Sequence, residues 1–119
     1  MNFLLMLYAE EKVGMAMPPE QMAGFMSQMA AYQQTLEKAG AFVATSALQP
    51  TVEARTISVT GGELKVHDGP YADTREQFGG YFIIEAPDMD EAIRLAALCP
   101  AAGWGSIEVR PYHPGYGPG

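Results

Sequence analysis

The sequence predicts an α+β fold, in which short strands are combined with two helices. Two continuous apolar runs, at residues 3–8 and 80–85, are typical of central strands covered on both faces. Two stretches, at residues 18–40 and 87–100, gather their apolar residues on one side of a helix. Between them, apolar and polar residues alternate on either side of Gly61-Gly62, which indicates a β-hairpin.

Composition bounds the function before any motif is considered. The chain has 119 residues, 48% of them apolar, and a net charge of −7. This length corresponds to one domain that can bury a core without metals or disulfides. The acidic balance argues against nucleic acid and against anionic membranes, because both are bound through Lys and Arg. The first apolar run is too short for a signal peptide or a membrane span and lacks a basic flank, so we expect a cytoplasmic protein.

The first helix is expected to begin at Pro18-Pro19-Glu20 and to end at Gly40. Proline fits the first turn because its missing N–H would be unpaired there, and glycine commonly follows the last turn. The apolar stripe is interpreted as core packing, with an adaptable methionine-rich binding face as the alternative. Its members are Met22, Phe25, Met26, Met29, Tyr32, Gln33 and Leu36.

The second helix is expected to begin at Pro87-Asp88 and to end before Pro100. Asp88 can cap its first turn, and Glu91 can complete a capping box. Cys99 is the one cysteine, so no internal disulfide is possible. The C-terminal end of a helix disfavours a thiolate, so Cys99 is expected to be a buried structural thiol rather than a nucleophile. No Cys/His spacing indicates zinc, and we expect no metal or cofactor.

The remaining segments complete the order of elements. Further strands are expected at residues 41–48 and 106–112, and a polar loop at residues 10–14. Residues 113–119 are rich in Gly and Pro and have no periodicity, so they are treated as a tail outside the domain of residues 1–112.

The hairpin has a predicted register. A two-residue turn at Gly61-Gly62 places Arg55 opposite Asp68. Opposed residues share a sheet face, so this charged pair should end an apolar stripe on the core-facing side, with His67 turned away. The stripe is Ile57, Val59, Leu64 and Val66.

The order strand–helix–strand, hairpin, strand–helix–strand predicts a ferredoxin-like antiparallel sheet with both helices on one face. The other face also carries apolar residues that need a cover. We therefore expect a homodimer with its sheets packed face to face, as in a dimeric α/β barrel.

Residues 68–80 read DGPYADTREQFGG and form the densest run of charge and turn residues in the chain. This segment resembles the signature of the DGPF family, within the YCII-related proteins. Tyr71 stands where the family name has Phe, and Asp73 and Arg75 stand where Glu and Lys are common. Further family-like features are Met17-Pro-Pro-Glu20, Leu48-Gln-Pro50, Cys99-Pro-Ala101 and Glu108-Val-Arg-Pro111.

The resemblance implies a ferredoxin-like dimeric α/β barrel. Family members are often encoded beside extracytoplasmic-function sigma factors, which implies a regulatory context, and the family has no established reaction. A His–Asp pair led to the proposal of enzymatic activity in the wider YCII group. We find no counterpart, because His67 should point away from Asp68 and His113 lies in the tail.

The candidate ligand-binding residues are Arg55, Asp68, Tyr71, Arg75 and Tyr81. Asp68 is also the one candidate for a catalytic base, and its simpler interpretation is a turn residue that binds backbone N–H groups before Gly69-Pro70. The simpler interpretation of Arg75 is a solvated charge or an ion pair. For Tyr71 and Tyr81 it is packing with a bound hydroxyl.

Three functions follow from these residues. The first is a dimer that binds a small molecule in a cleft near Asp68, as a sensor or accessory factor. The second is a cofactor-free isomerase, lyase or oxygenase of the kind hosted by related barrels, which rests on analogy of fold. The third is a protein-interaction partner of a sigma factor.

Overall fold

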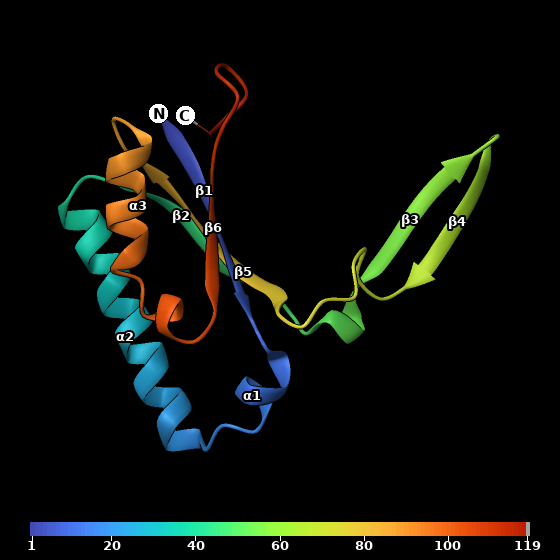
Figure 1. Ribbon diagram of the computed structural model, residues 1–119, viewed down its shortest axis with the longest axis horizontal. Coiled ribbons are helices and arrows are strands. Elements are labelled where there is room, and N and C mark those ends of the chain that lie inside the picture. Colours follow the sequence, from blue (N-terminus) through green and yellow to red (C-terminus); the bar gives the residue numbers. More distant parts are fainter. Residues whose placement is uncertain (119) are drawn as a thin grey trace.

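The computed structural model describes residues 1–118, which form an α+β fold with a four-stranded antiparallel sheet and a separate hairpin (Figure 1). In spatial order the sheet contains β2 (Phe42–Ala47), β5 (Gln77–Glu85), β1 (Asn2–Ala9) and β6 (Ser106–Pro111). The helices are α1 (Glu11–Met15), α2 (Pro19–Lys38) and α3 (Met89–Ala97). The sheet is open at β2 and β6, so the described residues of one chain do not close a barrel.

The inner positions of the sheet belong to β1 and β5, as their continuous apolar runs predicted. β5 begins at Gln77, three residues earlier than expected. The pairing of β1 with β5 continues past a bulge between Leu7 and Tyr8, so that Tyr8 pairs with Phe78 and Ala9 with Gln77.

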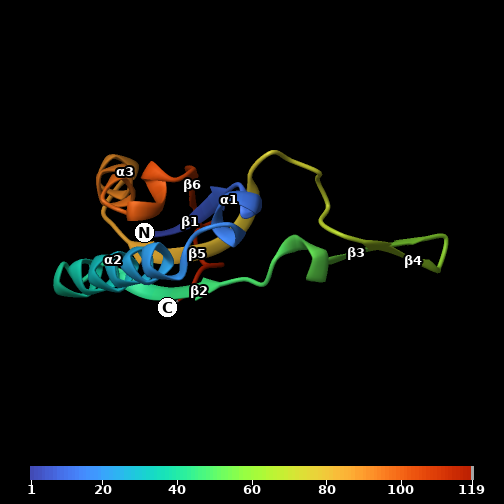
Figure 2. The ribbon, with the colours of Figure 1, turned by 90° about the horizontal axis from the view of Figure 1, so that it is seen from below.

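Helices α2 and α3 cover the same face of the sheet, as predicted (Figure 2). Between them and the sheet lies the core, whose most buried side chains are Phe3, Leu5, Leu36 and Ile84. Only the C-terminal half of α2 is buried there, through Tyr32 and Leu36. The core interpretation of its stripe therefore holds for that half alone.

The ends of these helices follow from local chemistry. Gly40 after α2 has φ +70°, a conformation that suits glycine. Asp88 caps α3, since its carboxylate accepts the Glu91 N–H at 2.9 Å. The expected return bond from Glu91 is replaced, because the Glu91 carboxylate accepts from the Arg94 guanidinium at 2.9 Å.

The polar loop expected at residues 10–14 is wrong, because this segment contains α1. Hydrogen bonds to residues that are distant in the sequence stabilise the start of α1. Gln77 Oε1 accepts the Glu11 N–H at 2.9 Å, and the Glu11 carboxylate accepts from Thr51 N at 2.7 Å. Two short 3-10 helices were also not anticipated, at Thr51–Glu53 (η1) and Pro100–Gly103 (η2).

The predicted register of the hairpin is confirmed, but its predicted burial is wrong. β3 (Arg55–Thr60) pairs with β4 (Glu63–Asp68), with Arg55 opposite Asp68 and Gly61 and Gly62 at φ 58° and 77°. The two strands make a sheet of their own, and every residue of β4 is exposed. Asp68 is therefore not core-facing, because alternation defines an apolar face but not what covers it.

Candidate binding site

Arg55 and Asp68, at the base of the hairpin, form an ion pair that is exposed to solvent. Arg55 Nε lies 3.1 Å from Asp68 Oδ1, with side chains 51% and 86% exposed. The Arg55 guanidinium also donates to the Ala54 carbonyl at 2.7 Å. An ion pair this exposed contributes about 0–1 kcal/mol to stability. Neither residue borders either of the two cavities described below.

The other predicted residues are dispersed. Tyr71 is 93% exposed and borders a cavity of about 560 Å³ beside η1 and the start of β5. Arg75 pairs with Glu10, with 2.9 Å between Nε and Oε1. Tyr81 borders a different cavity, which lies between α2 and the sheet. The structure thus joins Arg55 to Asp68 but does not gather the five residues around one cleft.

The cavity between α2 and the sheet has a volume of about 570 Å³ and a mostly apolar lining. Residues 22–29 of α2 supply one wall, through Met22, Phe25, Met26 and Met29. Trp104 stands beside it, with its ring 5.7 Å from that of Phe25 in an edge-on arrangement. Methionine and aromatic side chains adapt to varied apolar shapes. The methionine stripe in the sequence predicted this wall. The prediction was the alternative interpretation of that stripe, namely an adaptable methionine-rich binding face.

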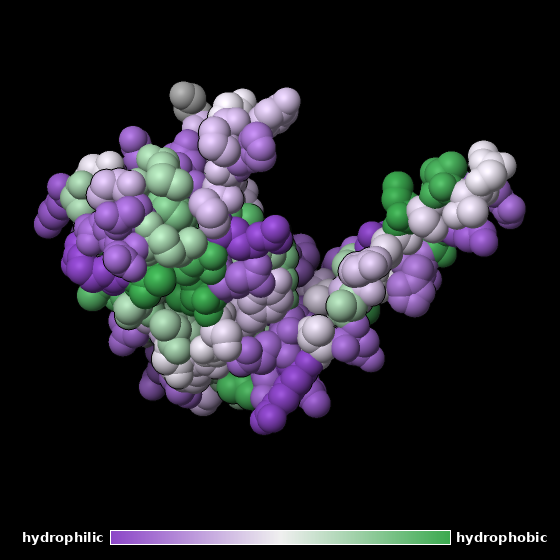
Figure 3. Space-filling view, turned by 45° about the horizontal axis from the view of Figure 1, so that its top comes forward, coloured by the Kyte–Doolittle hydropathy of each residue, from purple (hydrophilic) through white to green (hydrophobic). Residues whose placement is uncertain are grey.

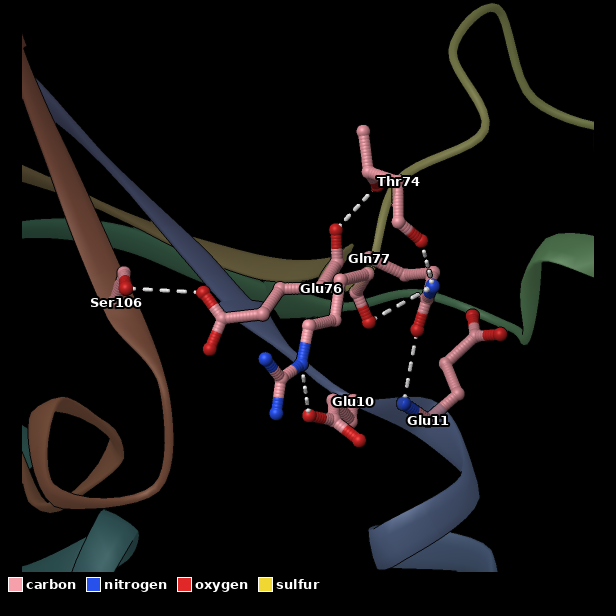
Figure 4. A network of polar contacts seen from close by, with 7 residues as sticks. Glu10, Glu11, Thr74, Glu76, Gln77 and Ser106 are labelled. Carbon is pink, nitrogen blue, oxygen red and sulfur yellow. Dashed lines mark hydrogen bonds and ion pairs between the residues drawn. The ribbon is translucent and has the colours of Figure 1, made fainter.

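A polar network, drawn in Figure 4, includes three residues of the cavity lining. Residues 74–77 of the signature segment bind the start of α1, through Arg75 to Glu10 and Gln77 to Glu11. Gln77 Nε2 also donates to the Thr74 carbonyl at 2.6 Å. Glu10, Glu11 and Gln77 border the cavity. This part of the signature is therefore a structural corner that positions the cavity wall.

The lining of this cavity offers little for acid–base chemistry. Its two carboxylates are engaged, Glu10 with Arg75 and Glu11 with the N–H and hydroxyl of Thr51. Among the residues that the structure describes, no histidine borders it. Among residues 1–118, no group of three or more His, Cys, Asp or Glu side chains is arranged to hold a metal ion. The arrangement suits binding of an apolar molecule better than proton transfer.

A family model described as the YCII-related domain matches residues 1–114. The chain belongs to the YCII-related family. An uncharacterised protein of Rhizobium meliloti is 35% identical over 120 residues, which cover 97% of each chain. Within the described part of this YCII-related chain, no helix combines the length and apolarity needed to cross a membrane.

The YCII-related chain also has two titratable groups in its core. Cys99 is 3% exposed, as expected of a structural thiol, and burial raises its pKa. Burial, and then the nearby Cys99, raise the pKa of Tyr32, whose hydroxyl donates to the Leu95 carbonyl at 2.8 Å. A raised pKa keeps both groups neutral and makes neither a nucleophile at neutral pH.

The raised pKa of Tyr32 predicts a loss of stability in alkali. The unfolded chain releases this proton near pH 10, whereas the folded chain retains it, so stability is complete below that pH and falls above it. In urea titrations between pH 8 and pH 11, we expect Tyr32→Phe to reduce the fall in unfolding free energy above about pH 10. Tyr71→Phe, at a residue 93% exposed, is the control and should keep the wild-type slope. Identical slopes for both variants would contradict the prediction.

Proposed function

We propose that this YCII-related protein binds a small, mostly apolar molecule in the cavity between α2 and the sheet, without catalysing a reaction on it. The observation that carries the proposal is the size and lining of the cavity. A volume of about 570 Å³ lies in the range of small-molecule sites. The mostly apolar lining, with its few polar groups already bound to protein partners, fits a ligand that is largely apolar.

Two of the predicted ligand-binding residues keep a part in this proposal. Tyr81 borders the cavity, although its pairing with Met6 places its side chain on the other face of the sheet, and Arg75 pairs with Glu10 of the cavity lining. Arg55, Asp68 and Tyr71 do not border it. No observation on the described residues favours an enzyme or a contact with a sigma factor over binding of a small molecule.

The proposal includes a ferredoxin-like arrangement and a homodimer. The strand order β2-β5-β1-β6, with α2 after β1 and α3 after β5, supports two strand–helix–strand units in one sheet. The face away from the helices carries half-buried apolar residues, which a second subunit would cover. They are Leu4, Met6, Tyr8, Phe78, Tyr81 and Ile83, and we call them the uncovered face.

Trp104 is the one tryptophan and borders the cavity, so its fluorescence reports on occupancy. We expect the apolar probe N-phenyl-1-naphthylamine to quench it saturably. Met26→Glu should weaken probe binding about tenfold or more, because it places a charge in the apolar wall. Met15→Glu is the matched control and should bind as wild type does, since Met15 is 74% exposed and does not border the cavity. Equal affinities in the two variants, or quenching without saturation, would refute the proposed site.

A further inference from the structure

The hairpin of β3 and β4, which we call the arm (Arg55–Asp68), stands clear of the rest of the molecule (Figure 1). The radius of gyration is 16.1 Å, against about 13.5 Å for a compact chain of this length. In both ribbon views the arm extends on the side of the sheet away from α2 and α3 (Figures 1 and 2). The uncovered face looks toward the same side.

The arm is amphipathic although it has no core to cover. Its cross-strand pairs place the apolar stripe on one face and Thr, Ser, Glu, Lys and His side chains on the other. The stripe is exposed to a high degree: Ile57 65%, Val59 66%, Leu64 59% and Val66 58%. Green apolar side chains are visible along the arm in Figure 3.

An isolated two-stranded hairpin is at best marginally stable in water. An arm with an apolar face therefore needs a surface to pack against, and the described residues of its own chain do not supply one, since they leave all four apolar side chains more than half exposed.

The charges of the arm permit a second copy of this chain to serve as that surface. The whole chain carries −7, so two copies repel each other. The arm, however, has two basic and two acidic residues, Arg55 and Lys65 against Glu63 and Asp68, and these cancel. It can therefore approach an acidic copy without net repulsion.

The number of residues on the arm and on the outward face of the sheet is also consistent with a dimer interface. A stable interface takes about 800 Å² and about 20–30 residues from each partner. The two arm strands have six residues each, and the outward-facing half of β1, β2, β5 and β6 brings the total into this range. Neither the arm nor the sheet reaches it alone.

We infer that the arm is a dimerisation arm, which embraces a second copy seated on the uncovered face, so that two copies exchange arms about a two-fold axis. The inference rests on the homodimer proposed above and names the element that holds it. In a two-fold assembly each arm residue acts twice, so one substitution changes two contacts.

The test is the molecular mass in sedimentation equilibrium over a range of concentrations. Wild type should have twice the 12.8 kDa of the chain. Val59→Glu, on the apolar face, should raise the dimer dissociation constant about 100-fold or more. Ser58→Glu is the matched control on the opposite face of the same strand and should remain dimeric. Val59 is 66% exposed in the single chain, so the substitution leaves the fold of one subunit intact.

The outcomes distinguish the proposed role of the arm from the existence of the homodimer. Dissociation by both Val59→Glu and Ile83→Glu, a change on the uncovered face, supports the inference. If Ile83→Glu alone dissociates the dimer, the proposed role of the arm is refuted, whereas the proposed homodimer is still supported. A wild type that is monomeric at every concentration overturns both, but not the binding cavity. Hydrogen exchange gives a second measure: amides of residues 55–68 should exchange more slowly at high protein concentration, and equal rates would count against the arm.

Discussion

Gly105→Ala is expected to destabilise the protein by about 3 kcal/mol. Gly105 lies where the chain enters β6, directly against the end of β1. A Cβ on this residue would stand 1.9 Å from the Tyr8 carbonyl oxygen and 3.0 Å from Ala9 Cα. Both neighbours are backbone atoms of a central strand, so the clash can be relieved only by moving the sheet.

Thermal unfolding measures this effect, with an expected fall in Tm of about 10 °C or more for a chain of this size. Gly103→Ala is the matched control, because a Cβ there meets no atom within 4 Å. The control should stay within about 0.5 kcal/mol of wild type. A Gly105→Ala variant with the same Tm as this control would show that the close approach of β6 to β1 is not required.

Leu36→Ala is expected to cost about 2–5 kcal/mol. Leu36 has no exposed surface and lies in the core between α2 and the sheet, so its truncation removes buried methyl groups and leaves a cavity. Leu98→Ala makes the same chemical change at a residue that is 51% exposed, and it should cost less than about 1 kcal/mol.

Urea titration of both variants gives the comparison. The prediction also tests how α2 is divided, because Leu36 belongs to the half that is buried in the core and Met26, 54% exposed, to the half that borders the cavity. If Leu36→Ala were as mild as Leu98→Ala, α2 would be held by contacts other than its buried half.

The proposed roles share one organisation. The helix-covered face of the sheet provides the core at one end of α2 and a cavity at the other. The opposite face and the arm are left for a second subunit. In this scheme the ligand and the partner bind on different sides of one sheet, so substitutions in the cavity and in the arm should act independently.

The sequence determined what depends on neighbours in the chain. The capping of α3 by Asp88, the end of α2 at Gly40, the inner positions of β1 and β5, and the pairing of Arg55 with Asp68 all follow from short-range patterns. The family was also accessible, because residues 68–80 carry its signature in one continuous segment.

Only the tertiary structure decided which distant residues meet. Arg75 reaches Glu10 and Gln77 reaches Glu11, and both contacts lie at the start of α1, in a segment that was expected to be a loop. The cavity lies beside residues 22–29 of α2 rather than at Asp68. Caps, alternation and turns act over a few residues, whereas a cavity or an exposed arm depends on distances between segments that local patterns do not encode.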